Sequence, residues 1–182
     1  MPDLRNRTGA TALQAVLYIL TTIILFALLA LPAGTGTAFA EQTADRVLVI
    51  KSKKRLYLIQ DDEVFASYHV VFGENPKGHK QQQGDQRTPE GHYILGYRNV
   101  NSSFYKSIHI SYPNKQDRIR ARERCVSPGG DIMIHGQPNE WAWISPFSRF
   151  VNWTDGCIAL SNRDMDAVWD AVRPGTPIEI RP

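Results

Sequence analysis

Short runs of β-forming residues, each followed by a turn, recur along this chain of 182 residues and limit the folds open to it. Gly, Pro, Asn and Asp bound the runs, which is typical of strands joined by tight turns. A polar stretch, Glu74–Arg87, reads as a long surface loop. The pattern therefore predicts a domain dominated by sheet. The expected strands are Val47–Ile50, Arg55–Ile59, Val64–Phe72, His92–Tyr97, Ser107–Tyr112, Ile132–Ile134 and Ile178–Ile180.

Two segments carry helical signals instead. Lys115–Arg124 is densely charged and indicates an exposed helix. Ser161 and Asp164 have the spacing of a capping box, in which a Ser side chain bonds the third backbone amide of the helix. The apolar residues that follow recur at the spacing of one helical face, namely Met165, Val168, Trp169 and Val172. Strands and helices together predict an α+β fold that is predominantly β.

The N-terminus has the layout of an export signal. Arg5 and Arg7 form a basic flank, the apolar stretch 10–31 follows, and small residues lead to Ala40. This order is typical of a secretory signal peptide cleaved after Ala40. The apolar stretch is also close to the ~20 residues that a spanning helix needs, so retention as an N-terminal membrane anchor is the alternative.

The chain is thus expected to divide into a targeting segment, residues 1–40, and one outward-facing domain, residues 41–182. Its 21 Lys and Arg against 18 Asp and Glu give a net charge of only +3. So small a charge gives no argument for binding nucleic acid.

Two cysteines, Cys125 and Cys157, occur in a chain predicted to reach an oxidising compartment. One structural disulfide is the first reading for an exported protein. The alternative is a free nucleophile at Cys157, which follows Gly156 and precedes an apolar stretch. A domain of about 140 residues can bury enough apolar surface to need no disulfide.

Cys157 needs two kinds of support if it attacks a carbonyl. A neighbouring base must take the thiol proton, and backbone donors must bind the developing oxyanion. The amides of Gly156 and Cys157 are candidate donors. Of the five histidines, His135 is the candidate base because it ends a buried strand at Gly136, where sites are often built.

Three motifs resemble those of the L,D-transpeptidase (YkuD-type) catalytic domain family. They are Ile132-Met133-Ile134-His135-Gly136, Thr154-Asp155-Gly156-Cys157-Ile158-Ala159-Leu160 and, upstream, Thr88-Pro89-Glu90-Gly91-His92-Tyr93. The family pattern pairs an HG motif with S/T-x-G-C-x-R. The resemblance covers roughly residues 46–181, and the Gly-Cys-Ile-Ala-Leu sequence is similar to one branch of the family.

The resemblance implies mixed, curved β-sheets and an enzyme of the cell envelope or periplasm that acts on peptidoglycan stem peptides without a metal or organic cofactor. Cys157 would be acylated by the carbonyl of the third stem residue, expelling the terminal D-alanine, with His135 as general base. Gly136 and Gly156 would shape the pocket, and Thr154 would occupy the hydroxyl position of the motif. The acyl group would pass to an amine on a second stem or on an envelope lipoprotein.

One departure from the family pattern is Ala159, which stands where the family usually has Arg. An Arg there could bind a carboxylate, and Ala cannot. The Gly-Cys-Ile-Ala-Leu branch includes an enzyme that detaches lipoprotein from peptidoglycan. The alternative function is therefore hydrolysis, either of lipoprotein links or as an L,D-carboxypeptidase.

Two rivals come from other classes. A zinc peptidase could use His92, His109, Asp131 or His135, although no H-E-x-x-H spacing is present. A non-catalytic wall-binding module would explain export but not the Gly-Cys pair. The tryptophans do not distinguish between these function classes. A lid over the substrate or core packing would each explain Trp141, Trp143 and Trp153, and Trp169 is expected in the core.

Overall fold

The computed structural model describes residues 42–141 and 150–182. The apolar stretch 10–31, the expected cleavage site at Ala40 and Trp143 lie outside the described residues, as does the side chain of Trp141. No helix in the described part is long and apolar enough to cross a membrane. The elements are β1 (Arg46–Ile50), β2 (Arg55–Gln60), β3 (Glu63–His69), β4 (Gly91–Ser102), β5 (Tyr105–Ile110), α2 (Lys115–Glu123), β6 (Met133–His135), the 3-10 turn η2 (Asn139–Trp141), β7 (Ile158–Ala159), α3 (Asn162–Ala171) and β8 (Pro177–Arg181).

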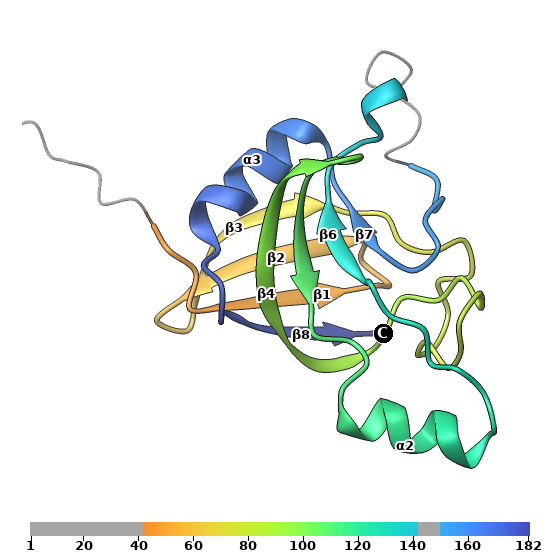
Figure 1. Cartoon of the computed structure of the whole chain (residues 1–182). Helices are drawn as coiled ribbons and strands as arrows, with labels where there is room; N and C mark the ends of the chain where they lie inside the picture. Colours follow the sequence, from red (N-terminus) through yellow and green to blue (C-terminus); the bar gives the residue numbers. More distant parts are fainter. Residues whose placement is uncertain (1–41, 142–149) are drawn as a thin grey trace, which may run out of the picture. The chain divides into compact units, whose positions relative to one another are not determined.

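The strands form one mixed sheet of eight, in the order β3-β2-β1-β8-β4-β5-β6-β7. The pairs β1–β8 and β6–β7 are parallel, and the other neighbours are antiparallel. The long strand β4 pairs with β8 along its first part and with β5 along its second, with register shifts on the way. Figure 1 shows β4 bending sharply, so the sheet curves and brings β6 and β7 in front of β1 and β2. The predicted sheet-dominated α+β class is confirmed.

Alternation of buried and exposed side chains explains the central strands. Val47 and Val49 of β1 face the core, as do Ile178 and Ile180 of β8, while their neighbours are more exposed. Successive side chains of a strand point to opposite faces, so this alternation fixes which face is buried. The core continues across the sheet through Leu56, Leu58, Phe72, Leu95, Ile108, Ile110, Ile134, Ile158 and Leu160.

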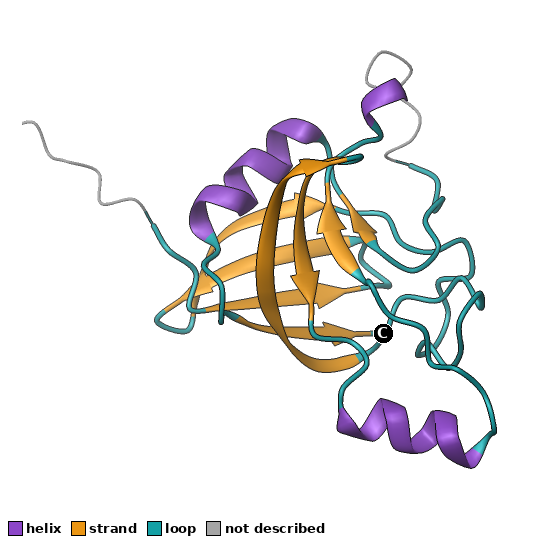
Figure 2. Ribbon diagram, in the orientation of Figure 1, coloured by secondary structure: helices purple, strands orange, loops and turns teal. Residues whose placement is uncertain are grey.

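The helices α2 and α3 lie well apart in Figure 2. Helix α2 begins with a complete capping box between Asn114 and Asp117. Helix α3 begins at Asn162, and its N-cap Ser161 accepts a hydrogen bond from the Asp164 amide at 3.1 Å, which is one of the two bonds of the predicted capping box. Trp169 of α3 is only partly buried and lies under the Arg98 guanidinium at 3.8 Å from its ring centre.

The strand limits differ from the prediction in two places that position the site. Strand β3 ends at His69, because the next residues leave the sheet and Val71 forms a bridge with Ala159 instead. Strand β4 continues beyond Tyr97 to Ser102 and carries polar residues to the far end of the sheet. The stretch Glu74–Arg87 is a loop, as expected, and the side chain of Lys80 within it is buried.

Candidate active site

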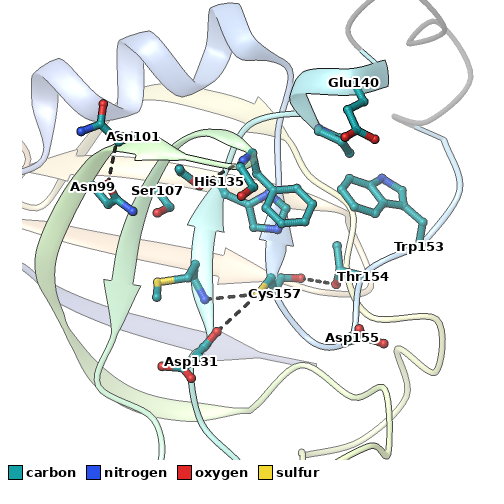
Figure 3. A pocket seen from close by; sticks show the side chains of 15 residues that line it. Asn99, Asn101, Ser107, Asp131, His135, Glu140, Trp153, Thr154, Asp155 and Cys157 are labelled. Carbon is teal, nitrogen blue, oxygen red and sulfur yellow. Dashed lines mark hydrogen bonds between the residues drawn. The ribbon is translucent and has the colours of Figure 1, made fainter.

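His135 and Cys157 come together because two short parallel strands lie side by side. Ile134 of β6 pairs with Ile158 of β7, and both side chains are fully buried, which anchors the strand pair in the core. Cys157 immediately precedes β7, and its Sγ accepts a hydrogen bond from the Met133 amide at 3.4 Å. Cys157 and His135 both line one cavity of about 760 Å³ (Figure 3). The structure therefore unites the two residues that the sequence selects as nucleophile and base.

The His135 imidazole is oriented by the chain itself. Its Nδ1 lies 2.7 Å from the Gly136 carbonyl oxygen. A carbonyl can only accept, so Nδ1 carries the proton and Nε2 keeps a free lone pair. The side chain is 3% exposed, and burial lowers its pKa to about 4, with the bond to Gly136 opposing the shift. His135 is thus a neutral base at pH 7, with the tautomer needed to accept a proton on Nε2.

Aromatic rings enclose this imidazole. The Phe104 ring centre lies 4.6 Å from that of His135, and the Trp153 ring stands edge-on to His135 at 5.7 Å. The sequence leaves open whether Trp153 covers the substrate or packs in the core. In the structure Trp153 lines the cavity next to His135. Its indole Nε1 is buried without a hydrogen-bond partner. These rings exclude water from His135 and account for its low pKa.

The Cys157 thiol is also neutral in the resting site. It is partly buried, and its Sγ lies 3.7 Å from the Asp131 carbonyl oxygen, to which it can donate. Burial raises the pKa of Cys157, and the Met133 amide opposes that shift. With a neutral thiol and a neutral imidazole lining one cavity, attack by Cys157 would require transfer of its proton to a base, because no preformed thiolate is present.

Thr154 holds the turn that presents the nucleophile. Its Oγ1 donates to the Cys157 carbonyl oxygen at 2.8 Å and accepts from the Gly156 amide at 3.2 Å. The side chain is buried, so these bonds are shielded from water. Because the Gly156 N–H is used inside the turn, the Cys157 amide is the better of the two candidate oxyanion donors that the sequence offers.

Gly156 and Gly136 are required by space. A Cβ on Gly156 would lie 2.6 Å from the Arg87 carbonyl oxygen, and its φ of +130° is unfavourable for other residues. A Cβ on Gly136 would lie 2.7 Å from Asn162 Oδ1 and 2.9 Å from Tyr105 Cβ. The Gly136 amide donates to backbone oxygens of β5 and the preceding turn. Both glycines allow neighbouring backbone and side chains to pack closely at these positions.

Several residues of the site carry no clear sequence signal. Ser107 of β5 is paired in register with His135 and lines the cavity beside it. Gly73 packs against the Gln86 carbonyl so closely that a side chain could not fit. Lys80, only 3% exposed, bonds Asp85 at 2.9 Å and braces the loop behind the nucleophile turn. Only the folded chain brings these distant segments together.

The other sequence candidates lie elsewhere or act differently. The Asp131 side chain is exposed, and it is the Asp131 backbone that faces Cys157. Ala159 is buried between β6 and Val71 and does not line the cavity. Cys125 is exposed and, like Cys157, is a free thiol, so the disulfide reading is wrong. Among the residues that the structure describes, no group of three His, Cys, Asp or Glu could hold a metal ion.

Comparisons with known proteins agree with this geometry. Residues 44–180 match the YkuD family model, described as the L,D-transpeptidase catalytic domain. An Escherichia coli K12 protein named "Putative L,D-transpeptidase YafK" is 30% identical over 112 residues, which are 60% of this chain and 38% of that protein. The chain therefore spans well under half the length of that relative.

Solved structures agree as well. The Campylobacter jejuni helical cell shape determining protein Pgp2 is 27% identical with a TM-score of 0.57, covering 74% of this chain and 46% of that one. Bdellovibrio bacteriovorus Bd1075 has the same fold at 23% identity and a TM-score of 0.51, covering 77% and 51%. The match over residues 44–180 means that the chain belongs to the L,D-transpeptidase catalytic domain family, a family of enzymes that act on peptidoglycan.

Proposed function

We propose that this chain is a cysteine L,D-transpeptidase that acylates Cys157 with a peptidoglycan stem peptide and passes the acyl group to an amine. One observation carries the proposal: the Cys157 thiol and a neutral His135 line the same cavity. No part of this chemistry requires a metal or an organic cofactor.

In the first step, Cys157 Sγ attacks the carbonyl of the third stem residue and forms a carbon–sulfur bond. The Sγ proton moves to His135 Nε2, whose lone pair is held free by the bond between Nδ1 and the Gly136 carbonyl. The oxyanion is stabilised by backbone donors, with the Cys157 amide as the candidate. The tetrahedral intermediate collapses, the bond to D-alanine breaks, and His135 protonates the leaving amine.

In the second step, an acceptor amine attacks the thioester. Its nitrogen bonds the acyl carbon, the carbon–sulfur bond breaks, and a proton returns to Sγ through His135. The cavity is lined by three carboxylates, those of Asp131, Glu140 and Asp155, and by no Lys or Arg among its described residues. Such a lining attracts cationic, amine-bearing substrates. This charge favours transfer to an amine, whereas attack by water would give the hydrolase alternative.

Residues 1–40 would act as a cleaved signal peptide or a membrane anchor, and residues 41–182 would work in the periplasm or envelope. The peptidoglycan partner could carry a lipoprotein. Similarity to Pgp2, a protein described as determining helical cell shape, supports a role of the same kind in cell shape.

Product analysis tests the proposal. The purified full chain is incubated with tetrapeptide muropeptides and, separately, with muropeptides linked to a lipoprotein fragment, and products are identified by mass spectrometry. D-alanine release with new dimers supports transpeptidation. Release of D-alanine without dimers, or release of the lipoprotein fragment alone, supports the hydrolase instead. Cys157→Ala is the control, and equal products from that variant would contradict the proposal.

A further inference from the structure

The catalytic cavity extends away from Cys157 along a row of paired residues. Asn99 of β4 is in register with Ser107 of β5, and Ser107 is in register with His135 of β6. These side chains lie on one face of the sheet and all line the cavity, as Figure 3 shows. Asn101 also lines it, whereas Val100 between them does not and is 60% exposed. Asn99 and Asn101 of β4 therefore mark the end of the cavity away from Cys157, here called the hairpin end.

The hairpin end differs chemically from the end beside the nucleophile. Its polar side chains are uncharged amides and hydroxyls, contributed by Asn99, Asn101, Ser102 and Ser103. Asn99 Oδ1 accepts from the Asn101 amide at 2.9 Å, which orients the Asn99 side chain. In the described part of the chain, neither Asn99 Nδ2 nor the Asn101 carboxamide has a protein partner. These groups are available to a ligand.

The distance from Cys157 to the hairpin end matches the length of one side of the substrate. Adjacent strands lie ~4.8 Å apart, and Cys157 directly precedes β7, three strands from β4, so Asn99 is ~14 Å from the nucleophile across the sheet. An extended peptide covers ~3.3–3.6 Å per residue, so this distance corresponds to about four residues. The stem has three residues and a lactoyl linker between the attacked carbonyl and its sugar, but only one residue, the leaving D-alanine, on the other side. The longer side of the substrate therefore fits the part of the cavity that extends from Cys157 to the hairpin end.

We propose that the hairpin end is a saccharide subsite that binds the N-acetylated amino sugar at the start of the stem. This inference rests on the proposed function, since it requires the stem carbonyl to lie at Cys157. A carboxamide such as that of Asn101 can pair with both the N–H and the C=O of an acetamido group. The Phe104 ring, which is 36% exposed, lines the same cavity but packs against His135, so it offers apolar surface beside the base and not at the hairpin end.

The test compares donors that differ only at the sugar end. D-alanine release by the full chain is measured with a disaccharide tetrapeptide, a lactoyl tetrapeptide and the free tetrapeptide. The wild type is expected to favour the disaccharide donor in kcat/KM by about tenfold or more. Asn99→Ala with Asn101→Ala should lower kcat/KM for that donor about tenfold and leave the free tetrapeptide unchanged. A tenfold change corresponds to ~1.4 kcal/mol, which is within the range of the lost hydrogen bonds. Val100→Ala, between the two on the opposite face, is the matched control and should preserve the preference.

Each other outcome has a defined meaning. Equal kcat/KM for all three donors in the wild type overturns the saccharide subsite and leaves the proposed function intact. Equal loss on all donors in the Asn variant assigns these residues a structural role and also overturns it. A preference already complete with the lactoyl donor would place the lactoyl group, and not the sugar, at the hairpin end. Wild-type inactivity on every donor would instead refute the proposed function.

Discussion

Acid should destabilise this protein through His135 in a predictable window. The pKa of His135 is about 4 in the folded chain, against an ordinary value of 6.5. Below pH 6.5 the unfolded chain binds a proton that the folded chain refuses, so stability falls as pH drops towards 4. Each pH unit in that window removes about 1.4 kcal/mol, and the total loss from this residue is about 3 kcal/mol. The side chain is 3% exposed, so solvent provides little screening.

The assay is urea unfolding of the full chain between pH 7 and pH 4. Carboxylates also titrate there, so the informative quantity is the difference between the wild type and His135→Gln, which keeps a polar side chain but cannot titrate. The free energy of unfolding of the wild type should fall by about 3 kcal/mol more than that of the variant. Parallel curves would show that His135 is not held neutral by burial, and the account of the base would be wrong.

Three further substitutions probe the nucleophile turn and the second thiol. Gly156→Ala should abolish acylation and yield little folded protein, because the new Cβ would lie 2.6 Å from the Arg87 carbonyl oxygen. Thermal unfolding and adduct formation check this, and wild-type values for both would contradict it. Thr154→Val should lower the free energy of unfolding by about 1–3 kcal/mol and slow acylation, with Thr154→Ser restoring both, because two buried hydrogen bonds are lost. Cys125→Ser should leave kcat/KM unchanged, because this thiol is exposed and free; a loss of activity with the fold intact would revive a role for it.

Much of the fold follows from local sequence. The apolar run Val47–Ile50 and the β-forming residues Ile178–Ile180 predict strands that the structure confirms. Only the structure shows that one face of each is buried, since both faces of Val47–Ile50 are apolar in sequence. The helix after Ser161 is confirmed because capping and an apolar face agree. The end of β3 at His69 cannot be predicted from sequence, because the residues that follow are as apolar as those of a strand. Only the fold shows that Val71 pairs with Ala159 instead of continuing β3.

The site is predictable to a different degree for each residue. His135 stands out because it ends a short apolar strand next to Gly136, and Cys157 because it follows Gly156 immediately before another; the fold brings both to one cavity. The orienting group of His135 is missed because it is a backbone carbonyl, which has no sequence signature. Ser107 and Asn99 are missed because their role depends on cross-strand register, which no local pattern specifies.

The most direct test of the central claim is the mass of the enzyme itself during turnover. The full chain is mixed with a tetrapeptide donor without acceptor, quenched in acid within seconds, and analysed intact and after peptide mapping. An adduct of the donor minus D-alanine is expected on Cys157, absent from Cys157→Ala and present in Cys125→Ser. D-alanine release without any adduct on Cys157, or undiminished release by Cys157→Ala, would contradict the assignment of Cys157 as the nucleophile.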